Sequence, residues 1–121
     1  MRFLILLATL LSMASAAHAG APESIVIPTD DKPLQTLLYR PDGEGPFPAV
    51  IALHGCDGVR GKTGIVRRSL DDWGRRLAAA GFVVVFPDSY GSRGLAHQCS
   101  NKAPKIRPDR ERVADVRAAR D

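Results

Sequence analysis

Two uninterrupted apolar segments constrain the fold of this chain more than any other feature. Residues 49–53 (AVIAL) and residues 82–86 (FVVVF) contain no polar side chain, so polar and apolar positions do not alternate along them. Strands exposed on one face alternate in this way, whereas strands of a parallel sheet are covered on both faces and are apolar throughout. The two segments are therefore predicted to be central strands of a parallel sheet.

The residues between these segments have the pattern of an amphipathic helix. Ser69, with Asp72 three positions later, predicts a capping box at its start, and Gly81 predicts a left-handed cap at its end. The apolar positions share one face, so we expect Trp73 to pack in the core. These positions are Leu70, Trp73, Leu77 and Ala80. Strand, helix and strand in this order form a crossover unit, which places the chain in the α/β class.

The remaining elements lie on either side of this unit. Residues 24–27 (SIVI) and 34–39 (LQTLLY) are separated by a turn-rich connection and are predicted to form a hairpin. A last helix is predicted from about Pro108, through Val113 and Val116, toward Asp121. No glycine, proline or polar loop closes this helix in the sequence. We therefore expect about four strands with crossover helices in a truncated domain.

The first 19 residues have the layout of a secretory signal peptide. Met1 and Arg2 give a positive start, residues 3–11 are apolar except for Thr9, and residues 17–19 (AHA) form a small-x-small cleavage site. A membrane anchor is the alternative, but the apolar stretch is shorter than the ~20 residues that span a bilayer. The sequence predicts a signal peptide at 1–19, a domain at 20–121, and a secreted or periplasmic protein.

The charge of the chain does not indicate a polyanionic partner. Lys and Arg number 17 against 13 Asp and Glu, a formal charge of +4, and cleavage of the leader removes Arg2 from this count. Four charged residues are spaced for intrahelical pairing on a solvated face, namely Asp71 with Arg75 and Asp72 with Arg76. Aromatic residues are not interleaved with the basic ones as in single-strand binders. We expect no nucleic-acid partner, and no membrane contact after leader cleavage.

A glycine-rich turn follows the first apolar segment at residues 54–58 (HGCDG). Ligands of α/β proteins bind at the carboxyl ends of strands, and glycines there let the backbone expose its N–H groups. Such groups, at Gly55 and Cys56, would stabilise a developing oxyanion. A plain connecting turn has the same local pattern, so both interpretations are open.

A second polar loop, residues 88–94 (DSYGSRG), follows the other apolar segment. Asp88 is a candidate catalytic acid, although an aspartate at a strand end more commonly fixes its own loop through hydrogen bonds to the backbone. Ser92 lacks the Gly-x-Ser-x-Gly context of a nucleophile. The candidates for the substrate side of the sheet are His54, Tyr90 and Arg93. For Arg93 the alternative is a solvated side chain.

The two cysteines are predicted to form a disulfide. Cysteine pairs in exported chains are more often bonded than free, and Cys56 and Cys99 both follow carboxyl ends of strands expected to be close together. The alternative is a reactive Cys56 paired with His54. We expect no metal site, because His54, His97 and Cys99 lack a standard ligand spacing.

Taken together, these segments resemble the dienelactone hydrolase family of α/β-hydrolases, in its exported form. The resemblance covers residues 41–121 and rests on the order and spacing of five features. They are residues 48–56 (PAVIALHGC), the helix with Trp73 and Leu77, residues 81–89 (GFVVVFPDS), Arg93-Gly94 followed by Cys99, and residues 112–115 (RVAD). It implies that residues 20–121 form a partial α/β-hydrolase domain, the N-terminal half of the sheet. In the family's strand order, the 49–53 strand would then have an open edge.

The resemblance also implies a function. The whole protein would hydrolyse a small carboxylic ester or lactone without a cofactor, and the N–H of Cys56, beside that of Gly55, would line the oxyanion hole. The catalytic nucleophile, acid and histidine of this fold are expected beyond Asp121. Neither Gly-x-Ser-x-Gly nor Gly-x-Cys-x-Gly occurs in the 121 residues. We therefore expect no catalytic triad in this chain and no hydrolysis by these residues alone.

Two other functions are consistent with the residues. One is a secreted, non-catalytic α/β module that is stabilised by the disulfide and acts through a partner. The other is a small thiol-dependent protein that uses Cys56.

Overall fold

The computed structural model describes residues 20–121. The predicted signal peptide, residues 1–19, lies outside the described residues. The elements follow in chain order as β1 (Glu23–Ile27), β2 (Leu34–Tyr39), β3 (Ala49–Ile51), α1 (Arg68–Ala79), β4 (Val83–Pro87), the short 3₁₀ helix η1 (Gly91–Arg93) and α2 (Glu111–Arg120).

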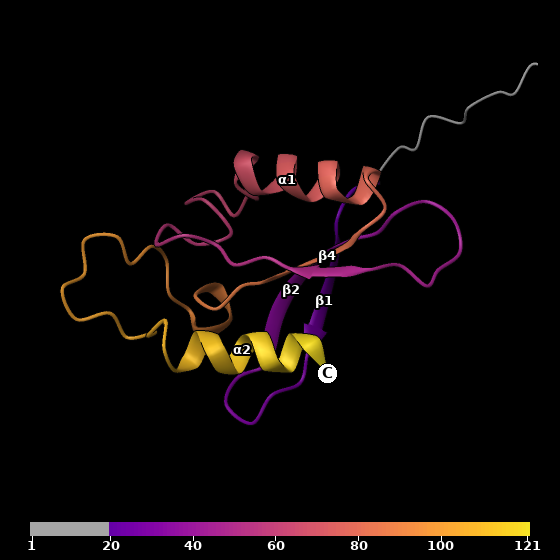
Figure 1. Cartoon of the computed structure of the whole chain (residues 1–121). Coiled ribbons are helices and arrows are strands. Elements are labelled where there is room, and N and C mark those ends of the chain that lie inside the picture. Colours follow the sequence, from indigo (N-terminus) through magenta and orange to yellow (C-terminus); the bar gives the residue numbers. More distant parts are fainter. Residues whose placement is uncertain (1–19) are drawn as a thin grey trace, which may run out of the picture.

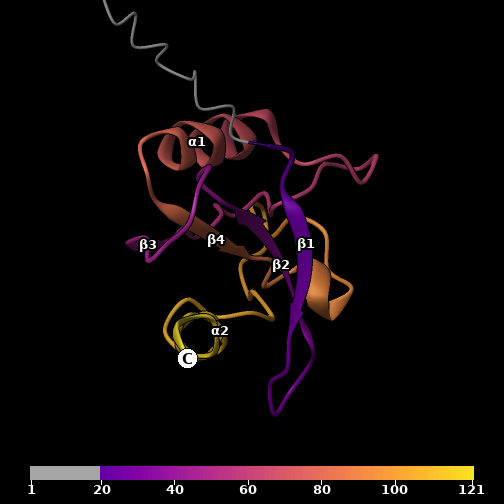
Figure 2. The same ribbon diagram turned by 90° about the vertical axis from the view of Figure 1, so that its right-hand side faces the viewer.

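The described strands form one sheet in the order β1-β2-β4-β3. The strands β1 and β2 form the predicted antiparallel hairpin, β2 pairs antiparallel with β4, and β3 pairs parallel with β4. Figures 1 and 2 show α1 on one face of this sheet and α2 on the other. The α/β class is confirmed, and both apolar segments contribute strands.

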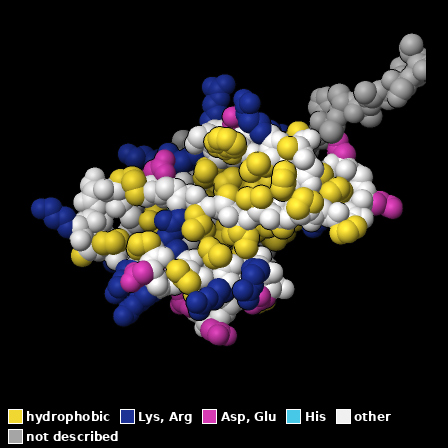
Figure 3. All heavy atoms as spheres, viewed as in Figure 1, with side chains coloured by type: hydrophobic (Ala, Val, Ile, Leu, Met, Phe, Trp, Pro, Cys, Tyr) yellow, Lys and Arg dark blue, Asp and Glu magenta, His cyan; other side chains and the backbone are white. Residues whose placement is uncertain are grey.

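The two apolar strands differ in position. Four of the five β4 residues are buried, because the strand lies between β2 and β3 and beneath both helices. In contrast, β3 is only three residues long and lies at an edge of the described sheet, so its position is not central. Leu53, just after it, is 45% exposed. Figure 3 shows hydrophobic side chains gathered on the side of the molecule where β3 lies, between α1 and α2.

The core lies between α1 and the sheet. Tyr39 and Phe86 meet edge to face, with ring centroids 5.8 Å apart. Gly74 lets the helix lie directly on this pair, because a Cβ there would come within 2.6 Å of the Tyr39 ring. The buried members of this cluster are Leu37, Tyr39, Val59, Ala78, Val84 and Phe86.

The prediction that Trp73 packs in the core is wrong, since its side chain is 61% exposed. The face that α1 turns to the sheet keeps the expected Leu70 and Leu77, but carries Gly74 and Ala78 in place of Trp73 and Ala80. Because the contact is made at a glycine, it has no room for an indole ring. Trp73 therefore lies on the flank of the helix.

The ends of α1 confirm one capping prediction and correct the other. Arg67 is the N-cap and no side chain caps the helix start, so the expected capping box at Ser69 is absent. At the other end, the Phe82 N–H donates to the Leu77 carbonyl and the Gly81 N–H to the Ala78 carbonyl. With Gly81 at φ +94°, these bonds form the Schellman motif that its glycine predicts.

The helix α2 begins at Glu111, three residues later than expected from Pro108. The Glu111 carboxylate accepts a hydrogen bond from the Arg107 N–H at 2.8 Å, which closes the turn before the helix. Its buried residue is Asp115, whereas Val113 is 38% exposed. Within residues 20–121, no helix has both the length and the apolar character needed to cross a membrane.

Candidate functional site

The turn that follows β3 forms the centre of the candidate site. The Gly58 N–H donates to the Gly55 carbonyl at 3.2 Å, and Gly58 adopts φ +80°, a conformation that favours glycine. Within the described chain, the N–H groups of Gly55 and Cys56 donate no hydrogen bond. Two consecutive N–H groups without a partner among the described residues therefore lie at the carboxyl end of a parallel strand, where ligands of α/β proteins bind.

His54 is buried at the start of this turn, with 2% of its surface exposed. Its Nδ1 lies 2.8 Å from the Gly55 carbonyl oxygen, and because a carbonyl only accepts, Nδ1 carries the proton. Burial lowers the pKa of this imidazole, and the nearby Arg112 guanidinium acts in the same direction. The ring packs edge to face on Tyr90, with centroids 4.6 Å apart.

The turn is also tied to its surroundings by side chains and by a disulfide. The predicted Cys56–Cys99 disulfide is present, and the Gln98 N–H donates to the Cys56 carbonyl at 2.6 Å. Arg67 donates to the Asp57 carbonyl at 2.6 Å and pairs with its carboxylate at 3.1 Å. The bonded sulfur of Cys56 is not a thiol nucleophile, which corrects the alternative that pairs Cys56 with His54.

Arg112 connects α2 to the same turn. Its Nη2 donates to the His54 carbonyl, and its guanidinium carbon lies 5.9 Å from the centroid of the Tyr90 ring. Three buried polar atoms have no hydrogen-bond partner within residues 20–121. They are His54 Nε2, Ser89 Oγ and Arg112 Nε.

The loop after β4 is held by hydrogen bonds to its own side chains and backbone. As predicted for a loop-fixing aspartate, Asp88 accepts a hydrogen bond from the Gly91 N–H at 2.8 Å. The Ser92 hydroxyl accepts the Gln35 N–H from β2 at 2.8 Å, so it is also used structurally. The Gly94 N–H donates to the Gly91 carbonyl, and the Leu95 N–H donates to the Tyr90 carbonyl.

Arg93 is neither solvated nor directed at the turn. Its side chain is 10% exposed and makes a bidentate ion pair with Asp115, at 2.9 and 3.0 Å, and a second pair with Asp31 at 2.9 Å. The hydrogen bond from Asp115 raises the pKa of the guanidinium. The solvated-arginine interpretation is therefore wrong. Of the three substrate-side candidates, His54 and Tyr90 lie together beside the turn, whereas Arg93 joins its loop to α2.

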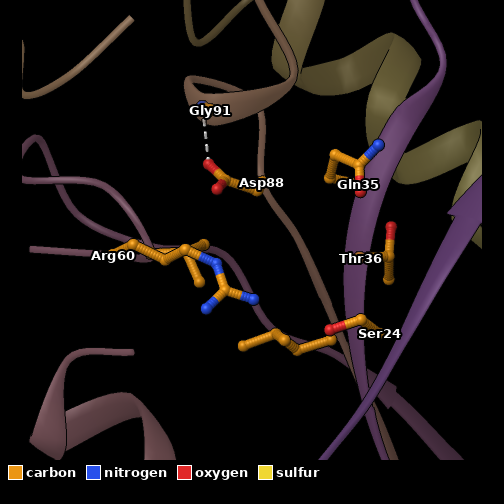
Figure 4. Close-up of a pocket in the computed structure, with 8 residues that line it drawn as sticks. Ser24, Gln35, Thr36, Arg60, Asp88 and Gly91 are labelled. Carbon is orange, nitrogen blue, oxygen red and sulfur yellow. Dashed lines mark hydrogen bonds between the residues drawn. The ribbon is translucent and has the colours of Figure 1, made fainter. Parts of the chain in front are cut away.

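Two neighbouring cavities open near these loops. One, of about 220 Å³, is lined by Asp57, Tyr90 and His97 among others. The other, of about 230 Å³, shares Arg60, Asp88 and Gly91 with it. Figure 4 shows Arg60 and Asp88 across this second cavity from the strand residues Ser24, Gln35 and Thr36. In the part of the chain that the structure describes, no cluster of three or more His, Cys, Asp or Glu residues could hold a metal ion.

Arg112 and Asp115 are the functional neighbours that the sequence analysis missed. Each makes its contact over a long sequence separation, 58 residues for Arg112 to His54 and 22 for Asp115 to Arg93. The spacing of neighbouring residues does not predict contacts over such separations. What could have indicated them is that these two charged residues lie among the apolar positions of the last helix.

Comparison with known proteins places these features in a family. The family model described as the dienelactone hydrolase family matches residues 34–120. No curated protein matches the chain. A solved structure of a candidate dienelactone hydrolase from Klebsiella pneumoniae subsp. pneumoniae is similar at 23% identity and a TM-score of 0.60. That match covers 82% of this chain and 41% of the Klebsiella chain.

A second similar structure is that of brefeldin A esterase, described as a bacterial homologue of human hormone sensitive lipase. The identity is 23% and the TM-score 0.48, with 95% of this chain and 29% of the esterase covered. The chain thus spans less than half the length of each of these two solved structures.

Proposed function

The chain belongs to the dienelactone hydrolase family, and from that premise we propose that the protein of which it forms a part hydrolyses small carboxylic esters or lactones. The observation that carries this proposal is the pair of free N–H groups at Gly55 and Cys56. When a nucleophile adds to an ester carbonyl, negative charge develops on the carbonyl oxygen, and preorganised N–H donors stabilise it. Each such donor contributes roughly 10²- to 10³-fold to kcat.

The described residues supply this electrostatic part of the reaction. The rings of His54 and Tyr90 pack together at the start of this turn, and the disulfide to Cys99 holds the turn in place. No cofactor or metal has a role in this proposal. Backbone N–H groups stabilise the developing oxyanion without a metal ion.

We further propose that the nucleophile, acid and histidine belong to another part of the protein. The chain covers 41% of the Klebsiella structure, and its sequence contains no Gly-x-Ser-x-Gly or Gly-x-Cys-x-Gly motif. Ser92 is engaged with Gln35, and Cys56 is bonded to Cys99. The proposal therefore assigns residues 20–121 a supporting role and no turnover of their own.

Hydrolysis of p-nitrophenyl butyrate by the full-length protein and by these 121 residues alone tests both parts. We expect turnover by the first and none by the second. Turnover by the 121 residues that is lost on Ser92→Ala or Cys56→Ala would overturn the assignment of the triad. A full-length protein without turnover of esters or lactones would favour the secreted, non-catalytic module.

We also propose that the protein is exported, with cleavage after residue 19. A basic start, an apolar centre and the residues AHA support the leader, and the Cys56–Cys99 disulfide is consistent with an oxidising compartment. Mass spectrometry of the mature protein from its native host is expected to give an N-terminus at Gly20. An intact N-terminus at Met1 would contradict the proposal.

A further inference from the structure

We propose that Arg112 and His54 are positioning residues of the turn after β3. Each donates a hydrogen bond to one carbonyl oxygen of the turn and thereby fixes the direction of the N–H group in the same peptide. The inference rests on the proposed function only for its catalytic consequence. The geometric part stands on the hydrogen bonds of the turn.

The first of these peptides joins Gly55 to Cys56. It is trans, since the cis bond of the described chain is Gly45–Pro46. In a planar trans peptide, the carbonyl and the N–H point in opposite directions. The Gly55 carbonyl accepts from His54 Nδ1–H at 2.8 Å and from the Gly58 N–H at 3.2 Å. These two bonds fix the plane and direct the Cys56 N–H away from both donors.

The second peptide joins His54 to Gly55 and is held by a residue of α2. Its carbonyl accepts a hydrogen bond from Arg112 Nη2. A bond from a guanidinium is about twice as strong as one between neutral groups. Arg112 is itself placed by α2 and by the Tyr90 ring beneath its guanidinium. The Gly55 N–H is therefore directed away from Arg112, by a side chain 58 residues further along the sequence.

The protonation of His54 agrees with this role. Its side chain is buried, and burial lowers its pKa, so the neutral form with one N–H predominates at neutral pH. That single N–H faces the Gly55 carbonyl. An asparagine at this position has an amide nitrogen where the imidazole has Nδ1, so it retains the donor, whereas a leucine removes it.

The test uses four variants of the full-length protein, namely His54→Asn, His54→Leu, Arg112→Lys and Arg112→Gln. Two matched controls replace exposed residues, Arg117→Gln on the same helix and Lys102→Gln on the loop after Cys99. Residual dipolar couplings of the Gly55 and Cys56 N–H vectors report their directions. Values of kcat and KM with p-nitrophenyl butyrate report the catalytic consequence.

We expect His54→Leu to alter the coupling of the Cys56 N–H and Arg112→Gln that of the Gly55 N–H. In both variants kcat should fall by roughly 10- to 100-fold, somewhat less than on loss of a donor, with little change in KM. His54→Asn and Arg112→Lys should recover most of this loss, and the controls should match the wild type. Recovery by the variants that keep a donor separates positioning from a general packing role.

Each result decides a specific part of the inference. Unchanged couplings in His54→Leu and Arg112→Gln would overturn it, whatever the activity. Equal loss of kcat in His54→Asn and His54→Leu would also overturn the role of the His54 N–H. If the wild type turns over no ester, the proposed function fails, while the couplings still test the positioning. If His54→Leu does not fold, His54→Ala replaces it as the variant without a donor for the Cys56 N–H, and the Arg112 pair of variants still tests the Gly55 N–H.

Discussion

The two loops at the carboxyl ends of β3 and β4 use their backbone in opposite ways. After β4, the loop donates its N–H groups internally, from Gly91 to Asp88 and from Gly94 and Leu95 back into the loop. After β3, the Gly55 carbonyl accepts from within the turn, from the His54 side chain and the Gly58 N–H, and Arg112 and the Gln98 amide hold the His54 and Cys56 carbonyls from outside. The Gly55 and Cys56 N–H groups are free within the described chain.

This difference separates a structural loop from a candidate site. A loop that satisfies its own donors has none to offer a ligand, whereas a turn held by its acceptors presents donors in fixed directions. The two loops are nevertheless coupled, since Tyr90 of the second packs on His54 of the first.

The largest expected effect is on the loop after β4, through Asp115→Asn. This side chain is 2% exposed in its bidentate pair with Arg93. The variant removes the buried carboxylate charge and leaves the Arg93 guanidinium with the exposed Asp31 as its remaining ion pair, so we expect a loss of about 3 to 5 kcal/mol in the free energy of unfolding. Urea titration of the full-length protein measures this loss. Asp109→Asn, in an exposed pair with Arg107, is the control and should leave the midpoint unchanged. Equal midpoints for the two variants would refute the structural role of Asp115.

The next effect is on the loop after β3, through its disulfide. Cys56 and Cys99 are separated by 43 residues, so on the chain-entropy account the double variant Cys56→Ala/Cys99→Ala should lose about 4 kcal/mol. The same titration, with and without dithiothreitol, measures it. The reductant should destabilise the wild type and leave the double variant unchanged. Faster hydrogen exchange of the β3 turn, with the β4 loop unaffected, would sharpen the comparison. An equal change in both loops would count against it.

A matched pair of glycine substitutions compares the two loops directly. In Gly91→Ala the new Cβ would lie 2.8 Å from Cγ of Asp88, whose carboxylate is buried and already bonded to the Gly91 N–H. We expect a cost of about 1 to 3 kcal/mol, as for overpacking. In Gly55→Ala the nearest atom is Oδ1 of Asp57 at 3.1 Å, on a side chain that can move. Gly55→Ala should therefore cost less, and thermal unfolding that ranks the pair in reverse would contradict the account.

The smallest expected effect is a dependence of stability on pH through His54. Its pKa is lower in the folded state than in the unfolded state, because burial penalises the charged form. The unfolded state therefore binds more protons, so His54 contributes stability above its unfolded pKa of about 6.5 that is lost as the pH falls below it. The groups that face the imidazole are Arg112, Tyr90, Asp57 and Asp88.

The variant His54→Asn should remove this component. Unfolding free energies between pH 7.5 and pH 5 should decline less steeply for His54→Asn than for the wild type, whereas the control Arg117→Gln should follow the wild type. Parallel curves for wild type and His54→Asn would show that the histidine is not held neutral by burial.

The sequence was informative where a pattern is local. The apolar segments at 49–53 and 82–86 predicted β3 and β4, Gly81 predicted the end of α1, and the turn at 54–58 was located by its glycines. Trp73 was misplaced because the spacing of apolar positions does not show that a glycine, Gly74, makes the closest contact with the sheet.

The parts of the site that could not be predicted are long-range contacts of charged residues. A helical arginine such as Arg112 normally has a solvated head, and nothing in its neighbours indicates a bond to the His54 carbonyl. Arg93 and Asp115 are likewise ordinary surface residues until the fold brings α2 against the β4 loop. Such contacts depend on tertiary packing, which the local pattern does not contain.

The central claim is that Gly55 and Cys56 supply the N–H groups of an oxyanion hole. Amide ¹H–¹⁵N spectra of the full-length protein, before and after inactivation by an alkyl p-nitrophenyl phosphonate, test it most directly, because the phosphonyl oxygen occupies the oxyanion position. The account predicts large downfield shifts of the Gly55 and Cys56 amide protons, with those of Gly91 and Gly94 unchanged. Complete inactivation without a shift at Gly55 and Cys56 would contradict it.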